Sequence, residues 1–304
     1  MLSYLELMRP HNCLMSVFAV FIGGLLVMKW DLSQLFALSP VSPIYLALLA
    51  VFLIAGAGNA INDYVDVEAD RINKPRRPVP SGRVSRNKAL AFSVILFAAG
   101  IVLAGIPPMN TFTFIIAALN SVLLVLYSFY LQGKLLAGNL AISYLAGSTF
   151  LFGGASLGNI VLPFILGLLA GLATLSREII KDIEDMEGDR LVAVKRMVRK
   201  AKERIKEKTG ISKKGISVHY GTRTAVSVAA LSLTAAVSVS PLPYVLGILG
   251  LSYVIMVMLA DAVFVLCISG MATAKRKRDY AKISRRIKIG MNLGFLAFVI
   301  GVLF

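Results

Sequence analysis

The feature that most constrains this chain is a series of nine apolar runs, each close to the length that crosses a lipid bilayer. A hydrocarbon core about 30 Å thick is spanned by about 20 helical residues. The runs lie at 11–28, 44–62, 89–105, 111–131, 136–157, 160–177, 224–240, 242–268 and 289–304. Backbone polar groups must be satisfied inside a bilayer, so each run is predicted to be a helix. The sequence therefore predicts an all-α, polytopic membrane bundle of nine helices around a central cavity, with a cytoplasmic cap, as a single domain over 1–304.

Composition agrees with a membrane protein and excludes several other classes. Of the 304 residues, 57% are hydrophobic, against about 45–50% in soluble domains, so disorder, collagen and a disulfide scaffold are excluded. Cys13 and Cys267 lie inside apolar runs, and two histidines are too few for a His-rich metal site. We interpret His11 and His219 as interfacial packing residues. A net charge of +16 would suggest nucleic acid in a soluble protein, but here membrane topology explains it, and no nucleic-acid partner is expected.

The distribution of charge predicts how the chain is oriented. With a cytoplasmic N-terminus, the inner segments and adjoining helix ends hold 31 of the 32 basic residues, and only Lys29 falls outside them. The outer connections at 105–110, 158–159 and 240–243 carry no charge. Cytoplasmic loops of membrane proteins carry an excess of Lys and Arg. The chain is therefore predicted to be a multi-pass protein of the cell membrane, and its first run, which lacks a basic leader and a cleavage site, is not read as a signal peptide.

Two acidic segments repeat each other at the cytoplasmic ends of predicted helices. Residues 59–71 read NAINDYVDVEADR, and residues 178–190 read EIIKDIEDMEGDR. Three aspartates of each segment align at an offset of 119 residues: Asp63, Asp66 and Asp70 with Asp182, Asp185 and Asp189. The spacing of 4, 3 and 4, counted from Asn59 or Glu178, predicts one helix face. The alternative is a pair of solvated helix ends whose acids pair with nearby Lys and Arg, but recurrence at identical spacing favours a functional site.

Aligned carboxylates repel one another, so this face is expected to require a cation. Hard oxygen ligands without Cys or His suit Mg²⁺, which binds a few carboxylates together with substrate phosphate oxygens. The loop glycine and final Glu of an EF-hand are missing. Basic residues lie around the acids, and a loop containing three prolines follows the first cluster at 71–82; the flanking cations are Arg9, Lys74, Arg77, Lys134 and Lys181. Acid clusters surrounded by cations predict a pyrophosphate-binding site.

These residues resemble the motifs of the UbiA superfamily of intramembrane prenyltransferases. The NDxxDxxxD motif is similar to residues 62–70, and the second motif, DxxDxxxD, to residues 182–189. An RPxPSG-like stretch occupies 77–82, and a Tyr-Ser…Lys pattern is present as Tyr127, Ser128 and Lys134. Nine helices are also this family's number, so the resemblance covers nearly the whole chain.

The resemblance implies that two Mg²⁺ ions, held by the aspartate clusters, bind the diphosphate of an allylic prenyl donor. Ionisation of the donor would give an allylic cation, stabilised by carboxylates and by Tyr127, which an acceptor attacks. The implied catalytic residues are Asn59, Asp63, Asp66, Asp182, Asp185 and Tyr127. The implied diphosphate- and substrate-binding residues are Arg9, Asn12, Lys74, Arg77, Ser128, Lys134 and Lys181. The implied metal ligands are Asp63, Asp66, Asp70, Asp182, Asp185 and Asp189.

Within the superfamily, the opening stretch at 4–12 and the second acidic segment look most like the branch that makes archaeal ether lipids. The donor would be geranylgeranyl diphosphate, and the acceptor the free hydroxyl of geranylgeranylglyceryl phosphate in the membrane. An aromatic or quinone-precursor acceptor is the alternative. An ion-coupled transporter is a further one, although transporter sites usually lie near the bilayer midplane. A CDP-alcohol phosphotransferase would carry the motif DGxxAR…GxxxDxxxD, which is not found.

Three features stand outside this pattern. Residues 190–214 form a basic extension with apolar residues spaced 3 and 4 apart: Leu191, Val194, Val198, Ala201 and Ile205. We interpret it either as an amphipathic helix at the cytoplasmic interface, covering the active site or binding anionic lipid, or as a solvated helix. Asp261 is predicted inside its helix, about two turns from the cytoplasmic end, facing the acceptor or pairing with Arg or Lys. Gly167 and Gly171 are predicted to allow close helix contacts.

Overall fold

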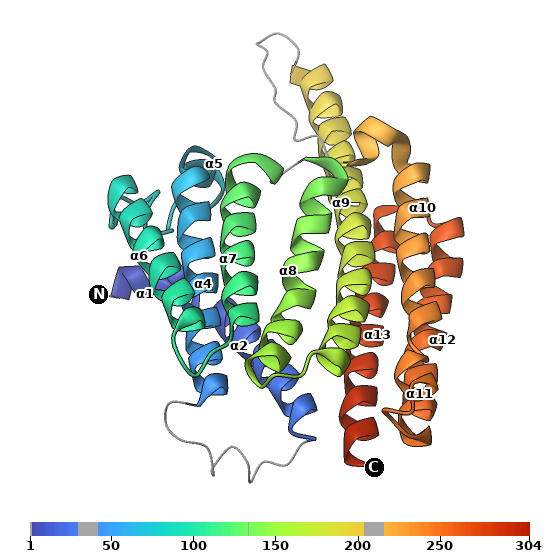
Figure 1. Cartoon of the computed structure of the whole chain (residues 1–304). Helices are drawn as coiled ribbons and strands as arrows, with labels where there is room; N and C mark the ends of the chain where they lie inside the picture. Colours follow the sequence, from blue (N-terminus) through green and yellow to red (C-terminus); the bar gives the residue numbers. More distant parts are fainter. Residues whose placement is uncertain (1, 30–41, 133, 204–215) are drawn as a thin grey trace. The chain divides into compact units, whose positions relative to one another are not determined.

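The computed structural model describes residues 2–29, 42–132, 134–203 and 216–304, and within them every regular element is a helix (Figure 1). The side chains of 72–73, 135 and 186–220 lie outside the description. The elements of the N-terminal part are α1 (Leu2–Met8), α2 (Pro10–Val27), α4 (Pro43–Val65), α5 (Val67–Asn73), α6 (Arg86–Gly105), α7 (Thr111–Leu126) and the π-helical turn η1 (Tyr127–Leu131). They are followed by α8 (Leu135–Ser156), α9 (Val161–Glu203), α10 (Ile216–Val239), α11 (Leu242–Val245), α12 (Leu251–Thr273) and α13 (Lys277–Leu303).

Nine helices in the described part of the chain are long and apolar enough to cross a membrane, which confirms the predicted fold class. Six of them begin within three residues of the predicted runs, and the last three do not. Helix α10 begins at Ile216, before the run predicted from 224, and is kinked at the left-handed Gly221, where its apolar span begins. The run predicted from 242 begins at Leu251, because two prolines confine 242–245 to the short α11 and a left-handed Gly247 turns the chain. The helix predicted from 289 begins at Lys277, because Lys and Arg are good helix formers and Asp279 caps its first turn.

Polar residues fix where several helices begin. Ser85 precedes α6, and its hydroxyl accepts a bond from the Lys88 amide at 3.4 Å. Asn110 precedes α7 in the same way, and its side chain accepts from the Thr113 amide at 3.0 Å. Such caps satisfy amide groups that the first helical turn leaves unpaired.

The chain divides into two compact units, and the first comprises Met1–Gln132 and Tyr144–Leu168. In this unit α4 packs against α2, α6 and α7, burying apolar residues of all four helices. Glycines allow close contacts between helices of this unit. A Cβ on Gly153 would overlap the carbonyl oxygen of Val20, and one on Gly167 would overlap that of Gly147. The prediction that Gly167 allows a close contact is therefore confirmed, since a larger side chain has no room there.

The second unit comprises Gly133–Ser143 and Leu169–Val302. Its core gathers apolar residues of α9, α10, α12 and α13 around Ile179, Leu233 and Ile287, all fully buried. Gly171 lies against α8, where its Cβ position is 3.1 Å from the carbonyl oxygen of Ser143. The predicted close contact at Gly171 is thus present, although it is looser than the one at Gly167.

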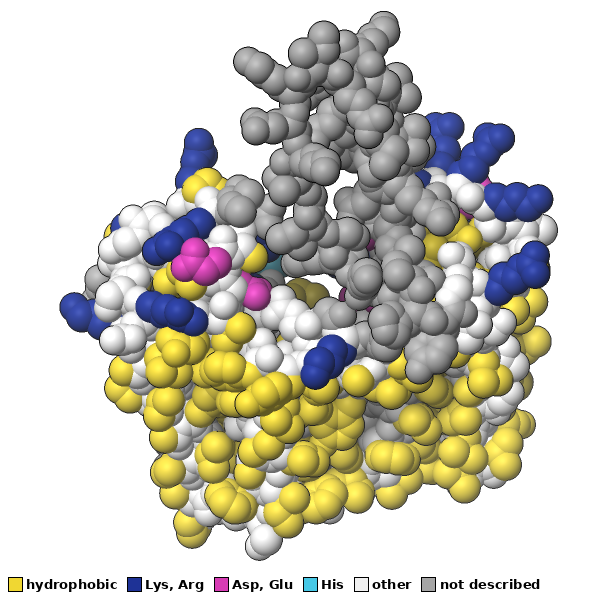
Figure 2. All heavy atoms as spheres, turned by 90° about the horizontal axis from the view of Figure 1, so that it is seen from above, with side chains coloured by type: hydrophobic (Ala, Val, Ile, Leu, Met, Phe, Trp, Pro, Cys, Tyr) yellow, Lys and Arg dark blue, Asp and Glu magenta, His cyan; other side chains and the backbone are white. Residues whose placement is uncertain are grey.

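The first part of the basic extension predicted at 190–214 belongs to α9. Helix α9 continues without interruption to Glu203, so 190–203 prolong this helix instead of forming a separate one. Residues 204–215 lie outside the described residues. On the face shown in Figure 2, Lys and Arg side chains project at the edges, whereas hydrophobic side chains cover the visible flank. This separation of charge from apolar surface is what a bilayer requires.

Candidate active site

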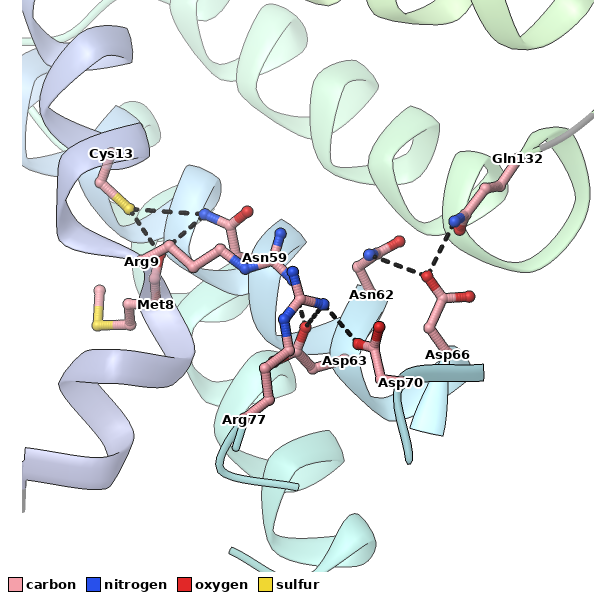
Figure 3. A network of polar contacts seen from close by, with 10 residues as sticks. All are labelled: Met8, Arg9, Cys13, Asn59, Asn62, Asp63, Asp66, Asp70, Arg77 and Gln132. Carbon is pink, nitrogen blue, oxygen red and sulfur yellow. Dashed lines mark hydrogen bonds and ion pairs between the residues drawn. The ribbon is translucent and has the colours of Figure 1, made fainter. Parts of the chain in front are cut away.

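The first acidic cluster forms where α4 ends. Asp63 is carried on the last turn of α4 and is only 1% exposed, while Asp66 lies between α4 and α5, and Asp70 lies within α5. The helix is thus broken at Asp66, and the single helical face predicted from the spacing is wrong in detail. Two of the acids face one way and Asp66 faces another (Figure 3).

Asp63 and Asp70 converge on a single guanidinium group. Nη1 of Arg77 donates to Oδ1 of Asp63 at 3.1 Å and to Oδ2 of Asp70 at 2.5 Å. Arg9 from the start of α2 donates to the same Oδ1 of Asp63. Two positive groups therefore compensate two closely placed carboxylates, as charge balance in a buried site demands. The sequence predicted these four residues to act together, and the structure places them together.

The loop that carries Arg77 is held from both sides. Its apolar residues Val79 and Val84 are buried against Leu7 of α1. Arg83 donates to the Glu6 carboxylate at 2.6 and 2.9 Å, and this hydrogen-bonded guanidinium lowers the pKa of Glu6. The three-proline loop is consequently attached to the N-terminal helix. Together α1, α5 and this loop form the small cap in the described part of this unit.

Arg9 reaches Asp63 because the chain breaks between α1 and α2. Arg9 adopts the left-handed conformation (φ 53°), and Pro10 starts the next helix. Nδ2 of Asn59 donates to the Met8 carbonyl at 2.8 Å, and the buried Cys13 thiol donates to the same oxygen at 3.1 Å. Asn59, predicted as catalytic, is thus directed at this junction. Asn12 and His11 lie exposed on the first turn of α2.

Asp66 is held by two carboxamides. Its Oδ2 accepts from Nδ2 of Asn62 at 3.3 Å and from Nε2 of Gln132 at 2.8 Å. Gln132 directly follows the π-helical turn, which contains Tyr127 and a buried Ser128 whose hydroxyl donates to the Leu124 carbonyl at 3.0 Å. Sequence reasoning missed Gln132, because nothing in its spacing relates it to the aspartates.

The second acidic cluster belongs to the other unit and lies on α9. Asp182 is half-buried and accepts a hydrogen bond from Nδ2 of Asn139 at 3.0 Å. Glu178 pairs with the neighbouring Arg177, while Asp185 is exposed. Asn139 was also missed, although a carboxamide within an apolar run is a signal that could have found it.

The other residues predicted from the sequence are three lysines and two further aspartates. Lys74, Lys134 and Lys181 are exposed, so their ammonium groups can contact water or a ligand. The side chain of Asp189 lies outside the described residues. Asp261 lies near the middle of α12 and not near its end, because this helix starts later and ends later than predicted. Its carboxylate accepts from the Ser240 hydroxyl at 2.6 Å, so the predicted pairing with Arg or Lys is replaced by a neutral partner.

The donor set fits a divalent cation of the Mg²⁺ type. Among the described residues no group of three or more His, Cys, Asp and Glu is arranged to hold a metal ion. However, oxygens of Asp63 and Asp70 already converge on one positively charged atom of Arg77, and the nearby amide and carboxylate groups supply only hard donors. Mg²⁺ prefers such oxygen ligands and is usually completed by water and phosphate.

Comparison with known proteins agrees with this site. A family model described as the UbiA prenyltransferase family matches residues 16–296. The chain therefore belongs to the UbiA prenyltransferase family, and it is a membrane prenyltransferase.

The chain is also similar to individual proteins over nearly its whole length. The chain is 40% identical over 302 residues to digeranylgeranylglyceryl phosphate synthase of Methanococcus maripaludis strain C6, covering 99% of this chain and 98% of the relative. A solved structure described as digeranylgeranylglyceryl phosphate synthase in membranes is 34% identical, with a TM-score of 0.85 and coverage of 99% and 98%. A UbiA homologue from Archaeoglobus fulgidus bound to GPP and Mg²⁺ has a TM-score of 0.62 at 15% identity over 97% of this chain and 99% of the homologue, and shows a shared fold.

Proposed function

We propose that this prenyltransferase moves a geranylgeranyl group from geranylgeranyl diphosphate to the free hydroxyl of geranylgeranylglyceryl phosphate. The product would carry the second ether bond of an archaeal membrane lipid. The similarity to synthases of that name over nearly the full length supports this choice of substrates. The observation that carries the chemistry is that the carboxylates of Asp63 and Asp70 converge on the guanidinium group of Arg77, beside further basic residues.

In the proposed reaction, the bond between the allylic carbon and the diphosphate oxygen breaks, and its electron pair leaves with the diphosphate. The acceptor hydroxyl oxygen forms the new ether bond to that carbon and releases its proton to solvent. Two Mg²⁺ ions, when bound, would neutralise charge on the departing diphosphate. Their ligands would be the aspartates of both clusters: Asp63, Asp66 and Asp70, and Asp182, Asp185 and Asp189.

The basic residues would bind phosphate oxygens once substrate is present. Arg77 and Arg9 are already adjacent to the carboxylates, and Arg is suited to bidentate phosphate contacts. Lys74, Lys134 and Lys181 are exposed and available as further phosphate ligands. The exposed Asn12 and the buried hydroxyl of Ser128, whose oxygen could still accept a hydrogen bond, are proposed as polar contacts of the substrate. Tyr127 is proposed to stabilise the allylic cation through its ring.

The membrane setting suits both substrates. Each carries an isoprenoid chain, and burying a CH₂ group outside water is worth about 0.8 kcal/mol. The phosphate-binding end of the protein is proposed to face the cytoplasm, since almost all basic residues fall on the side predicted to be cytoplasmic.

The direct test incubates the purified protein with geranylgeranyl diphosphate, geranylgeranylglyceryl phosphate and Mg²⁺, and measures diphosphate release together with the mass of the lipid product. We expect transfer that stops with EDTA and resumes with added Mg²⁺. A parallel reaction contains 4-hydroxybenzoate as the acceptor. Turnover with the aromatic acceptor and none with the glyceryl phosphate would show that the acceptor is wrong, and a rate unaffected by EDTA would refute the metal chemistry.

A further inference from the structure

Helix α7 passes at its C-terminal end into the π-helical turn η1, and this turn sets the direction of the Gln132 side chain, which follows it. The backbone N–H of Gln132 donates to the backbone carbonyl of Tyr127 at 2.8 Å. This bond connects residues five apart, whereas the bonds of an α-helix connect residues four apart. Such a widened turn rotates the following side chains relative to a regular α-helix, and it is often found at functional sites. Here it brings the Gln132 carboxamide beside Asp66 (Figure 3).

The carboxamide of Gln132 uses only one of its two ends. Nε2 donates to Asp66 at 2.8 Å, whereas Oε1 is buried and has no hydrogen-bond partner in the described part of the chain. A buried acceptor without a donor is costly, because it has lost its water without replacement. A bound cation close to Asp66 would satisfy that oxygen.

Asp66 differs from its neighbours in how its charge is balanced. Asp63 and Asp70 accept bonds from guanidinium groups. Asp66 instead accepts from the neutral carboxamides of Asn62 and Gln132, both directed at Oδ2. Neutral donors orient the carboxylate without cancelling its charge, so Asp66 keeps its attraction for a metal ion.

We propose that Gln132 is part of the cation site, with Nε2 fixing the carboxylate of Asp66 and Oε1 serving as a neutral oxygen ligand. This inference rests on the proposed function, because it assumes that a divalent cation binds with the diphosphate. It adds to the aspartate motif a residue that is remote in sequence and is brought into place by the π-helical turn.

The test measures binding of Mn²⁺, as a paramagnetic substitute for Mg²⁺, to purified protein in the presence of inorganic pyrophosphate. Gln132→Met keeps the size of the side chain and removes both polar ends, so we expect the Kd for Mn²⁺ to rise about 10-fold or more. Gln132→Glu keeps an oxygen at the ligand position, and its Kd is expected to stay within about 3-fold of the wild-type value.

Asn120→Leu is the matched control. Asn120 is another carboxamide of the same helical segment, and its Nδ2 donates to Ser148 at 3.0 Å. Its Oδ1 is also buried and has no hydrogen-bond partner among the described residues. Loss of Mn²⁺ affinity in Gln132→Met but not in Asn120→Leu would support the proposal. Unchanged affinity in Gln132→Met, or equal losses in Gln132→Met and Gln132→Glu, would overturn it while leaving the proposed function intact. Wild-type protein that binds no Mn²⁺ would refute the proposed metal chemistry as well.

Discussion

At the scale of single residues, Asp63 is the most deeply buried aspartate of the first cluster. It is almost completely buried, and both Arg9 and Arg77 donate to it. Asp63→Asn keeps its shape but removes the negative charge that is proposed to hold metal. We expect transfer to fall at least about 100-fold, the size of effect seen when one electrostatic contact is lost from an active site. The rate is measured with saturating substrates, and Mn²⁺ binding is measured on the same samples.

Glu68→Gln provides the control for this prediction. Glu68 lies in the same acidic segment, but its carboxylate is exposed and pairs with the exposed Arg71. Surface pairs of this kind contribute little, so Glu68→Gln should retain the wild-type rate. Asp182→Asn should behave as Asp63→Asn does. Full activity in both aspartate variants, with the proteins folded in detergent, would refute the metal-site assignment.

Asn59 gives a second prediction at this scale, in which stability and catalysis change together. Its amide satisfies the Met8 carbonyl at the break that positions Arg9. Asn59→Leu would leave this buried carbonyl with only a weak thiol donor, which is expected to lower the free energy of unfolding by about 1–3 kcal/mol. Displacement of Arg9 should also raise the KM for the prenyl diphosphate. Cys13→Ala removes only the weaker donor and should have the smaller effect on both quantities, and an Asn59→Leu protein with unchanged stability and KM would contradict this role.

At the scale of secondary-structure elements, the close approach of helices depends on glycines. A Cβ at Gly153 would overlap the backbone of Val20, which cannot move aside as a flexible side chain can. Gly153→Ala is therefore expected to destabilise the protein by about 1–3 kcal/mol, the usual cost of overpacking. Gly294→Ala is the control, because its new Cβ would meet only Ala260 at 3.9 Å. Since Ala favours helix by about 1 kcal/mol over Gly, this variant should keep or raise the unfolding temperature. Equal unfolding temperatures for the two variants would show that the predicted overlap is relieved.

The elements that the sequence predicted well are those fixed by local properties. A run of about 20 apolar residues must be a helix in a bilayer, so the sequence predicted all nine spans found in the described part of the chain, and most of their starts lie close to the observed ones. The helix break at Asp66 and the π-helical turn before Gln132 were missed, because they depend on partners distant in the sequence. For the same reason the acidic motifs were recognised from spacing, whereas the carboxamides that orient them, Gln132 and Asn139, were not.

At the scale of the whole molecule, the proposed orientation in the membrane predicts which helix ends face the cytoplasm. Cysteine labelling can test this prediction. Cys13 and Cys267 are both fully buried, so a single added cysteine can be labelled over an unreactive background. Helix α12 is about 34 Å long at 1.5 Å per residue, enough to cross the bilayer, and exposed residues flank its ends: Ile248 and Lys275. In intact cells, a membrane-impermeant maleimide should label Ile248→Cys, and it should label Lys275→Cys only after the membrane is permeabilised.

The same experiment on α6 examines the unit that carries the first acidic cluster. Ile106 and Lys88 are exposed near opposite ends of this helix, and the basic end follows the loop that contains Arg77. Ile106→Cys should therefore react in intact cells, and Lys88→Cys only after permeabilisation. If Lys88→Cys and Lys275→Cys were accessible from opposite sides, the basic ends of the two units would face different compartments. The two acidic clusters could not then act on one diphosphate, so the proposed reaction requires that these two positions be labelled from the same side.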